Sequence, residues 1–129
     1  MKHLIAAIVI AFASLTSLPV SARHVVPKPG DQWPLSRWCK ANDAKGIAAV
    51  RLALERNSFK EYIEAIKRKD TTCVDLRYIP LPPETVIVLK GLFLVRHNDK
   101  LCGQFFLSET RYNIKLVFWV LVPCPIKGM

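Results

Sequence analysis

The chain has 129 residues, four cysteines and a net charge of +9 at pH 7. This length leaves room for one small domain and no more once a leader is removed. The chain contains no internal repeat and no low-complexity segment. An even number of cysteines in a small exported chain is typical of a disulfide framework.

Residues 1–22 match the three-part pattern of a secretory signal peptide. Lys2 supplies the basic start, residues 4–13 form an apolar run, and the small side chains of Val20 and Ala22 mark a cleavage site. A retained membrane anchor is the alternative, but a spanning helix needs about 20 apolar residues. We therefore expect a secreted or periplasmic protein that begins at Arg23 and has no stable membrane span. Losing Lys2 lowers the net charge from +9 to +8.

Residues 23–38 are rich in proline and lack periodicity, which predicts an extended arm. Trp33 and Trp38 lie at the end of this arm. They are candidates for an aromatic ligand contact. The alternative, which we favour, is that they anchor the arm in the domain, because large aromatic side chains are mostly buried.

Two amphipathic helices are predicted between Cys39 and Cys73. The first covers residues 43–56 and has a wide apolar surface. The second follows Ser58, a good N-cap with Glu61 three residues later. Its apolar side chains recur at helical spacing and form one stripe, made of Phe59, Tyr62, Ile63 and Ile66. The short turn between the helices predicts a hairpin or corner that covers a sheet.

The second half of the chain predicts short strands over residues 74–79, 85–90, 92–97, 101–107 and 114–122. Gly91 separates the predicted strands 85–90 and 92–97, and Asn98–Asp99 predicts a hairpin turn between 92–97 and 101–107. The predicted fold class is α+β, with an N-terminal two-helix segment followed by a small antiparallel sheet of four to five strands. An SH3-like roll is one possible form of that sheet. We expect residues 39–129 to form a single disulfide-stapled domain.

The cysteines are expected to pair as Cys39–Cys73 and Cys102–Cys124. Four cysteines allow three pairings, and sequence neighbourhood favours this one. A zinc site is disfavoured because no C-x-x-C pair occurs, and the mature chain offers only His24 and His97 as histidine ligands. No metal and no cofactor are expected.

The candidates for catalysis are few. His97 is the only histidine inside the folded part and precedes a turn, and Ser58 is needed as a helix cap. Nothing near His97 resembles a nucleophile with an orienting partner. The chain contains none of the common phosphate-binding, nucleophile-elbow or zinc-protease motifs. We therefore expect no catalytic residues.

Positive charge gathers on the helical segment. The candidate residues for binding an anionic partner are Arg51, Arg56, Lys60, Lys67, Arg68 and Lys69. Such a surface suits an acidic envelope protein or an anionic polymer, and the alternative is a solvated surface that aids solubility. Export makes nucleic acid an unexpected partner.

These observations predict a small, basic, exported protein of the bacterial envelope or extracellular space that binds a partner and is not an enzyme. The alternative is a small secreted hydrolase or toxin-like effector. A concave site where His97 meets tyrosine and acid side chains would favour the enzyme.

Overall fold

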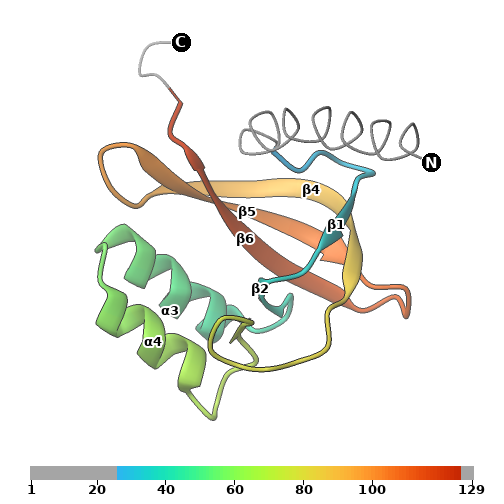
Figure 1. The fold of residues 1–129 in the computed structure, drawn as a ribbon, viewed down its shortest axis with the longest axis horizontal. Helices are drawn as coiled ribbons and strands as arrows, with labels where there is room; N and C mark the ends of the chain where they lie inside the picture. Colours follow the sequence, from blue (N-terminus) through green and yellow to red (C-terminus); the bar gives the residue numbers. More distant parts are fainter. Residues whose placement is uncertain (1–25, 126–129) are drawn as a thin grey trace, which may run out of the picture.

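The computed structural model describes residues 26–125, so the predicted leader lies outside the described residues. A pair of helices packs against a curled antiparallel sheet (Figure 1). The sheet has six strands in the order β1-β4-β5-β6-β2-β3. The α+β class is therefore confirmed, and the two disulfides are present as predicted.

The two helices lie where the sequence places them. Helix α3 (Ala44–Glu55) is capped by Asp43, whose carboxylate accepts a hydrogen bond from the backbone N–H of Gly46 at 2.9 Å. Helix α4 (Phe59–Lys67) is capped by Ser58, whose hydroxyl accepts from the N–H of Glu61 at 3.2 Å. Asn57 makes the turn between them with a φ of 50°. The two helices therefore form the predicted hairpin.

The order of elements differs from the prediction. Strands β1 (Gln32–Pro34) and β2 (Arg37–Lys40) come from the end of the proline-rich arm and precede the helices. The helices are thus not N-terminal to the sheet, and the sheet has six strands instead of four to five. Periodicity could not reveal β1 and β2 because strands of three and four residues are too short to carry a pattern.

The predicted strand over residues 74–79 is also shorter in the structure. Only β3 (Val74–Asp75) is a strand, and it pairs with β2. The backbone N–H groups of Tyr78 and Ile79 both bond to the carbonyl of Asp75, which bends the chain into a turn. This turn brings Arg77 back beside Asp75.

The remaining three strands form a consecutive meander. They are β4 (Thr85–Arg96), β5 (Leu101–Glu109) and β6 (Lys115–Pro123). The predicted break at Gly91 was wrong, because β4 runs through it with two register shifts between Val88 and Phe93. A bulge lets a strand bend without ending, and this bending curls the sheet.

Each side of the sheet has its own hydrophobic core. The helix side buries Val50, Leu54 and Ile66 against Phe105 and Trp119. The opposite side buries a smaller cluster formed by Leu35, Val86, Val88, Phe106, Leu116 and Phe118. Burial on both sides explains why β6 lacks clean alternation of apolar and polar residues.

Candidate functional site

A pocket opens where the α3–α4 turn meets the end of β6. Its volume is about 190 Å³, and its walls are Arg37, Ala53, Leu54, Asn57, Ser58, Phe59, Tyr62, Arg77, His97, Trp119 and Leu121. At about 30 Å³ per water molecule, it holds about six waters. It is therefore smaller than the clefts of about 300–1,000 Å³ that take cofactors and drug-sized molecules. A single side chain or a small polar group fits its size.

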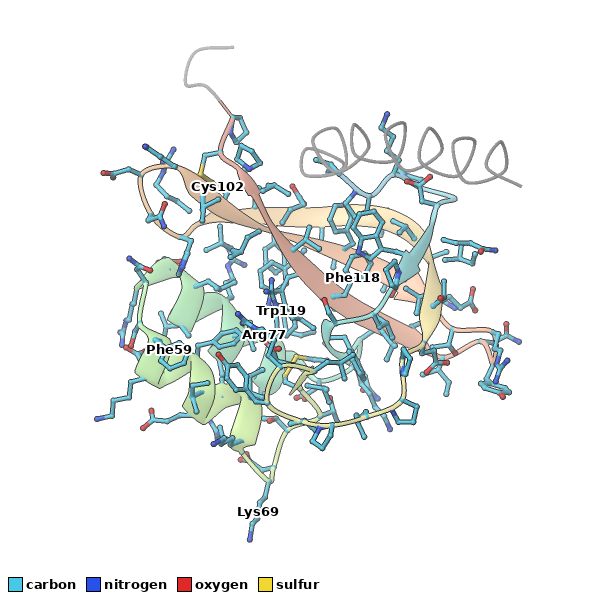
Figure 2. All side chains as sticks on the ribbon, in the orientation of Figure 1. Phe59, Lys69, Arg77, Cys102, Phe118 and Trp119 are labelled. Carbon is cyan, nitrogen blue, oxygen red and sulfur yellow. A yellow bond between two sulfur atoms is a disulfide. The ribbon has the colours of Figure 1, made fainter. Side chains whose placement is uncertain are left out.

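Phe59 lies at the mouth of this pocket and departs from its predicted role. The sequence places Phe59 on the buried stripe of α4, but the side chain is 65% exposed, while Tyr62 and Ile66 are buried. As the first residue of α4, Phe59 meets Tyr78 edge-on, with ring centroids 6.2 Å apart. Figure 2 shows Phe59, Arg77 and Trp119 near one another, and all three line the pocket. An exposed aromatic ring at a pocket mouth is available for contact with a ligand.

A buried carboxylate organises one wall of the pocket. The Asp75 side chain is fully buried and accepts hydrogen bonds from the Tyr62 hydroxyl at 2.6 Å and from Arg77 Nη2 at 2.8 Å. Arg77 also donates its Nε and its backbone N–H, and Arg37 Nε lies 3.5 Å from the carboxylate. We call these four residues the Asp75 cluster. A buried carboxylate is tolerated only when it is paired in this way.

The cluster fixes the protonation of its members. Burial alone raises the pKa of Asp75, but hydrogen bonds from Arg77 and Tyr62 outweigh it and hold that pKa below its ordinary value. Burial and the hydrogen bond to Asp75 raise the pKa of Tyr62. The cluster therefore contains two guanidinium cations, one carboxylate and a neutral phenol, which sum to a net charge of +1. The side chain of Arg77 is 56% exposed and turns part of this charge toward solvent.

His97 also lines the pocket but is held by the backbone. Its Nδ1 lies 2.9 Å from the carbonyl oxygen of Leu54. A carbonyl only accepts, so Nδ1 carries the hydrogen and Nε2 is left for other partners. No carboxylate orients this histidine among the hydrogen bonds of residues 26–125, since its partner is a peptide group.

Trp119 forms part of the pocket floor. Its indole Nε1–H is buried and makes no hydrogen bond of good geometry within the described part of the chain, although it is close enough to the Tyr62 hydroxyl to oppose the rise in the pKa of that phenol. The ring meets Tyr62 edge-on, with centroids 6.4 Å apart, and stacks on Phe105. An unpaired buried donor costs about 1–3 kcal/mol, so it marks a place where a bound acceptor would be favoured.

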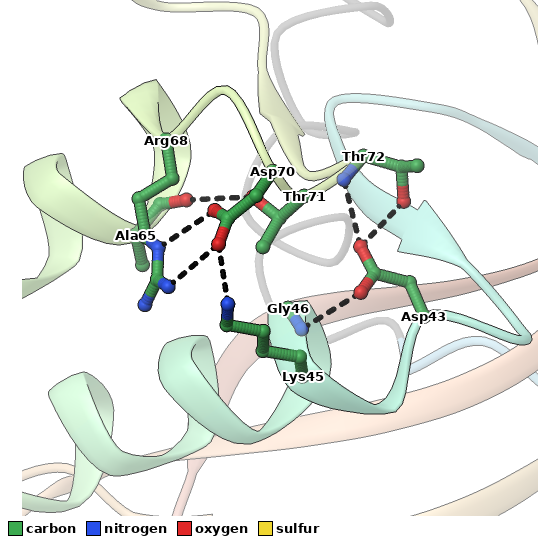
Figure 3. Close-up of polar contacts among 8 residues, drawn as sticks. All are labelled: Asp43, Lys45, Gly46, Ala65, Arg68, Asp70, Thr71 and Thr72. Atoms are coloured by element: carbon green, nitrogen blue, oxygen red, sulfur yellow. Dashed lines mark hydrogen bonds and ion pairs between the residues drawn. The ribbon is translucent and has the colours of Figure 1, made fainter.

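The predicted basic residues are engaged in different ways. Arg51 lies over the Phe93 ring, 4.3 Å from its centroid, and Arg56 pairs with Glu61 at 3.2 Å. Arg68 forms two 3.0 Å hydrogen bonds to Asp70, which Lys45 also contacts (Figure 3). Within residues 26–125, no ion pair involves Lys60, Lys67 or Lys69. Lys69 projects away from the body of the protein (Figure 2).

The predicted aromatic candidates lie away from the pocket. Trp33 is in β1 and Trp38 is in β2, and both pack partly buried against the smaller core. Trp38 also lines a second hollow of about 530 Å³ with Tyr112 and the 81–85 segment. Both tryptophans are therefore placed to hold the end of the arm against the sheet.

Both cysteine pairs match the predicted pairing. Cys39–Cys73 joins β2 to the start of β3, and Cys102–Cys124 joins the start of β5 to the residue after β6. A disulfide framework indicates folding outside the reducing cytoplasm. Among the residues that the structure describes, no group of three or more metal-ligating side chains occurs, and no helix is long and apolar enough to cross a membrane.

No sequence pattern predicted the Asp75 cluster. The one local signal is the Asp75-Leu76-Arg77 triplet, an acid and a base two residues apart at the end of a strand. Tyr62 was expected only as part of an apolar stripe, and Arg37 only as part of the arm. Five segments separated in sequence build the cluster and the pocket, so no spacing pattern could connect them.

Comparison with known proteins gives no assignment for this fold and site. No protein-family model, no curated protein and no solved structure matches the chain.

Proposed function

We propose that this chain is an exported binding protein that holds an anionic group of a partner at the pocket beside the Asp75 cluster. The predicted leader and the two disulfides support a secreted or periplasmic location, in the bacterial envelope or the extracellular space. The expected partner is an acidic envelope protein or an anionic polymer.

One observation carries this proposal. Two guanidinium groups share a single carboxylate at the pocket wall, so one positive charge is uncompensated there. Arg77 is held in place by Asp75, which lowers the entropy lost when it binds an anion. Apolar side chains such as Leu54, Leu121 and Phe59 line the same space. A fixed cation beside an apolar hollow suits a ligand that joins a negative group to an apolar one.

The exposed lysines of α4 add attraction at longer range. Lys60 and Lys67 are seven residues apart and so lie on the same side of the helix, and Lys69 follows its end. With a mature net charge of +8, the chain draws acidic partners at a rate that falls as salt rises. In this proposal the helical cations steer the partner, and the pocket holds it.

The second candidate is a small secreted hydrolase. It is favoured by one fact, which is that Ser58, Tyr62 and His97 line the same pocket. Against it, the Ser58 oxygen caps α4, and in the described part of the chain no hydrogen bond joins Ser58 to His97. Asp75 is committed to two arginines and so does not orient His97. The side chains that a nucleophile–base–acid arrangement would need, Ser58, His97 and Asp75, make structural hydrogen bonds instead of bonding to one another.

The proposal is tested by capturing partners from the host envelope fraction with tagged mature protein. Arg77→Gln should lower recovery of an acidic partner at low salt, and Lys67→Glu, Arg68→Glu and Lys69→Glu together should slow its association. Arg111→Gln, a change at an exposed site beside Tyr112, is the matched control. If the amount of acidic partner recovered is the same for the wild type and both variants, and the same at low and high salt, the proposal is contradicted. Loss of turnover of an envelope component in Ser58→Ala or His97→Ala would favour the hydrolase.

A further inference from the structure

Among residues 26–125, no strand pairs with the far half of β6 on the β2 side. Strand β2 pairs with β6 only from Leu116 to Phe118, whereas β5 pairs with it from Lys115 to Pro123. Figure 1 shows β6 continuing past the start of β2 toward the C-terminus. We call residues 120–123, on the β2 side, the open edge.

The residues just before β2 turn away from this edge. The N–H of Leu35 bonds to the carbonyl of Glu84, and the carbonyl of Ser36 accepts from Leu76. The arm therefore turns toward β3 and β4 instead of continuing along β6. The side chain of Leu35 is buried in the core on the opposite side of the sheet.

The open edge presents the backbone groups of Leu121. The carbonyl of Lys115 bonds toward β2, to the N–H of Ala41, while Ile114 and Cys124 bond toward β5. Backbone groups alternate sides along a strand, so odd-numbered residues of β6 face β2 and its extension. The N–H and C=O of Leu121 therefore point into the open edge, one donor and one acceptor ready for a strand.

The pocket lies directly under this edge. The side chains of Trp119 and Leu121 both line it, on the helix side of the sheet. In an antiparallel pair, directly opposed residues place their side chains on the same side of the sheet. A residue paired with Leu121 would therefore send its side chain into the pocket.

The charge at the end of the edge sets the direction of such a strand. An added strand is stopped where β2 begins, at Arg37, and Arg77 lies beside it in the Asp75 cluster. A chain end that meets two guanidinium groups is favoured when it is the negatively charged C-terminus. A strand with its C-terminus at Arg37 runs antiparallel to β6, in line with β2.

We propose that the open edge of β6 and the pocket beneath it bind the C-terminal residue of an extended partner polypeptide. The terminal residue pairs with Leu121, its apolar side chain fills the pocket, and its carboxylate meets Arg37 and Arg77. The pocket volume of about 190 Å³ accommodates one large side chain and little more. This inference rests on the proposed function, since it names the part of the partner that the pocket holds.

The strand added to β6 would reuse a known mode of recognition. Backbone hydrogen bonds to a sheet edge give affinity, and pockets for alternate side chains give specificity. The Trp119 ring lies in the floor and would contact the terminal side chain. The expected partner is therefore a protein that ends in an extended segment with an apolar last residue.

Fluorescein-labelled peptides of alternating threonine and valine test the proposal by fluorescence anisotropy on the disulfide-bonded mature protein. One set ends in leucine or phenylalanine with a free carboxylate, a second is amidated, and a third ends in lysine. We expect binding by the first set and a loss of about tenfold on amidation or with the lysine terminus. Equal binding by the free and amidated peptides would overturn the proposal.

Two variants at one position separate backbone from side chain. Leu121→Pro removes the N–H at the open edge while leaving the ladder to β5 intact, and Leu121→Ala keeps that N–H. Both variants should melt as cooperatively as the wild type. Leu121→Pro should lose binding by about tenfold or more, and Leu121→Ala should lose less. If both bind as the wild type does, the edge is not used.

The outcomes also separate this inference from the proposed function. If the envelope partner is still captured but the peptides neither bind nor compete, the partner docks elsewhere and only the inference fails. If no acidic partner is captured at all, the proposed function fails as well. Concentration-dependent dimerisation of the protein that Leu121→Pro abolishes would assign the edge to a second copy and would also overturn the inference.

Discussion

The phenol of Tyr62, on α4, donates a 2.6 Å hydrogen bond to the buried carboxylate of Asp75, on β3. This bond links the helix hairpin to the edge of the sheet at the wall of the pocket. Because Tyr62 also meets Trp119 edge-on, the same ring connects the carboxylate to the pocket floor. The stability of the domain and the geometry of the pocket therefore depend on one pair of residues.

Removing the Tyr62 hydroxyl should destabilise the domain. Tyr62→Phe deletes one donor to a buried charged acceptor, so we expect a loss of about 1.5–3 kcal/mol in the free energy of unfolding. Tyr112→Phe is the matched control, because Tyr112 is 64% exposed and its change should stay within about 0.5 kcal/mol. Denaturant melts of both variants make the comparison, and equal stability would show that the bond adds nothing.

The Asp75 carboxylate should make stability depend on pH in the acid range. Its pKa is lower in the folded protein than in the unfolded chain, so its contribution is present above about pH 4 and is lost as pH falls through the folded pKa. Asp75→Asn should therefore cost more at pH 7 than at the lowest pH at which both proteins fold. Chemical melts across pH measure the difference, and a cost that is constant with pH would contradict a charged Asp75.

The prediction from sequence succeeded where neighbours in the chain determine the structure. Ser58 and Glu61 define the start of α4, Asn98–Asp99 defines a hairpin, and cysteine spacing suggested both disulfides. The prediction failed where the structure of a segment depends on a partner that is distant in sequence. Strand β1 forms because it pairs with β4, and Trp33 in β1 lies opposite Val86, about fifty residues later in the chain. The pocket was not predicted for the same reason.

Each disulfide should contribute to stability through the loop that it closes. The two bridges span 34 and 22 residues. The loop-entropy model gives about 3–4 kcal/mol for each. Cys102→Ser with Cys124→Ser should lower stability by that amount, and Cys39→Ser with Cys73→Ser should cost more because both of those cysteines are buried. Calorimetry of the two double variants compares their losses of stability. A larger loss for the Cys102–Cys124 variant would contradict the prediction.

The phase of α4 is tested by two residues on opposite sides of the helix. Ile66 is 2% exposed and packs in the larger core, whereas Glu64 is exposed. Ile66→Asp buries an unpaired carboxylate and should unfold the domain. Glu64→Ala should change stability by about 0.5 kcal/mol or less. Circular dichroism melts distinguish the variants, and similar melting temperatures would mean that the helix faces the sheet differently.

The most direct test of the binding account follows the three tryptophan indole signals by NMR while a peptide with a free carboxylate and a terminal leucine is added. We expect the signals of the Trp119 indole N–H and the Leu121 amide to shift together as the pocket fills, while the indole signals of Trp33 and Trp38 do not shift. The amidated peptide should shift the Trp119 and Leu121 signals less at the same concentration. Shifts confined to Trp33 and Trp38, or to the lysines after α4, would show that the pocket beside Asp75 is not where the partner is held.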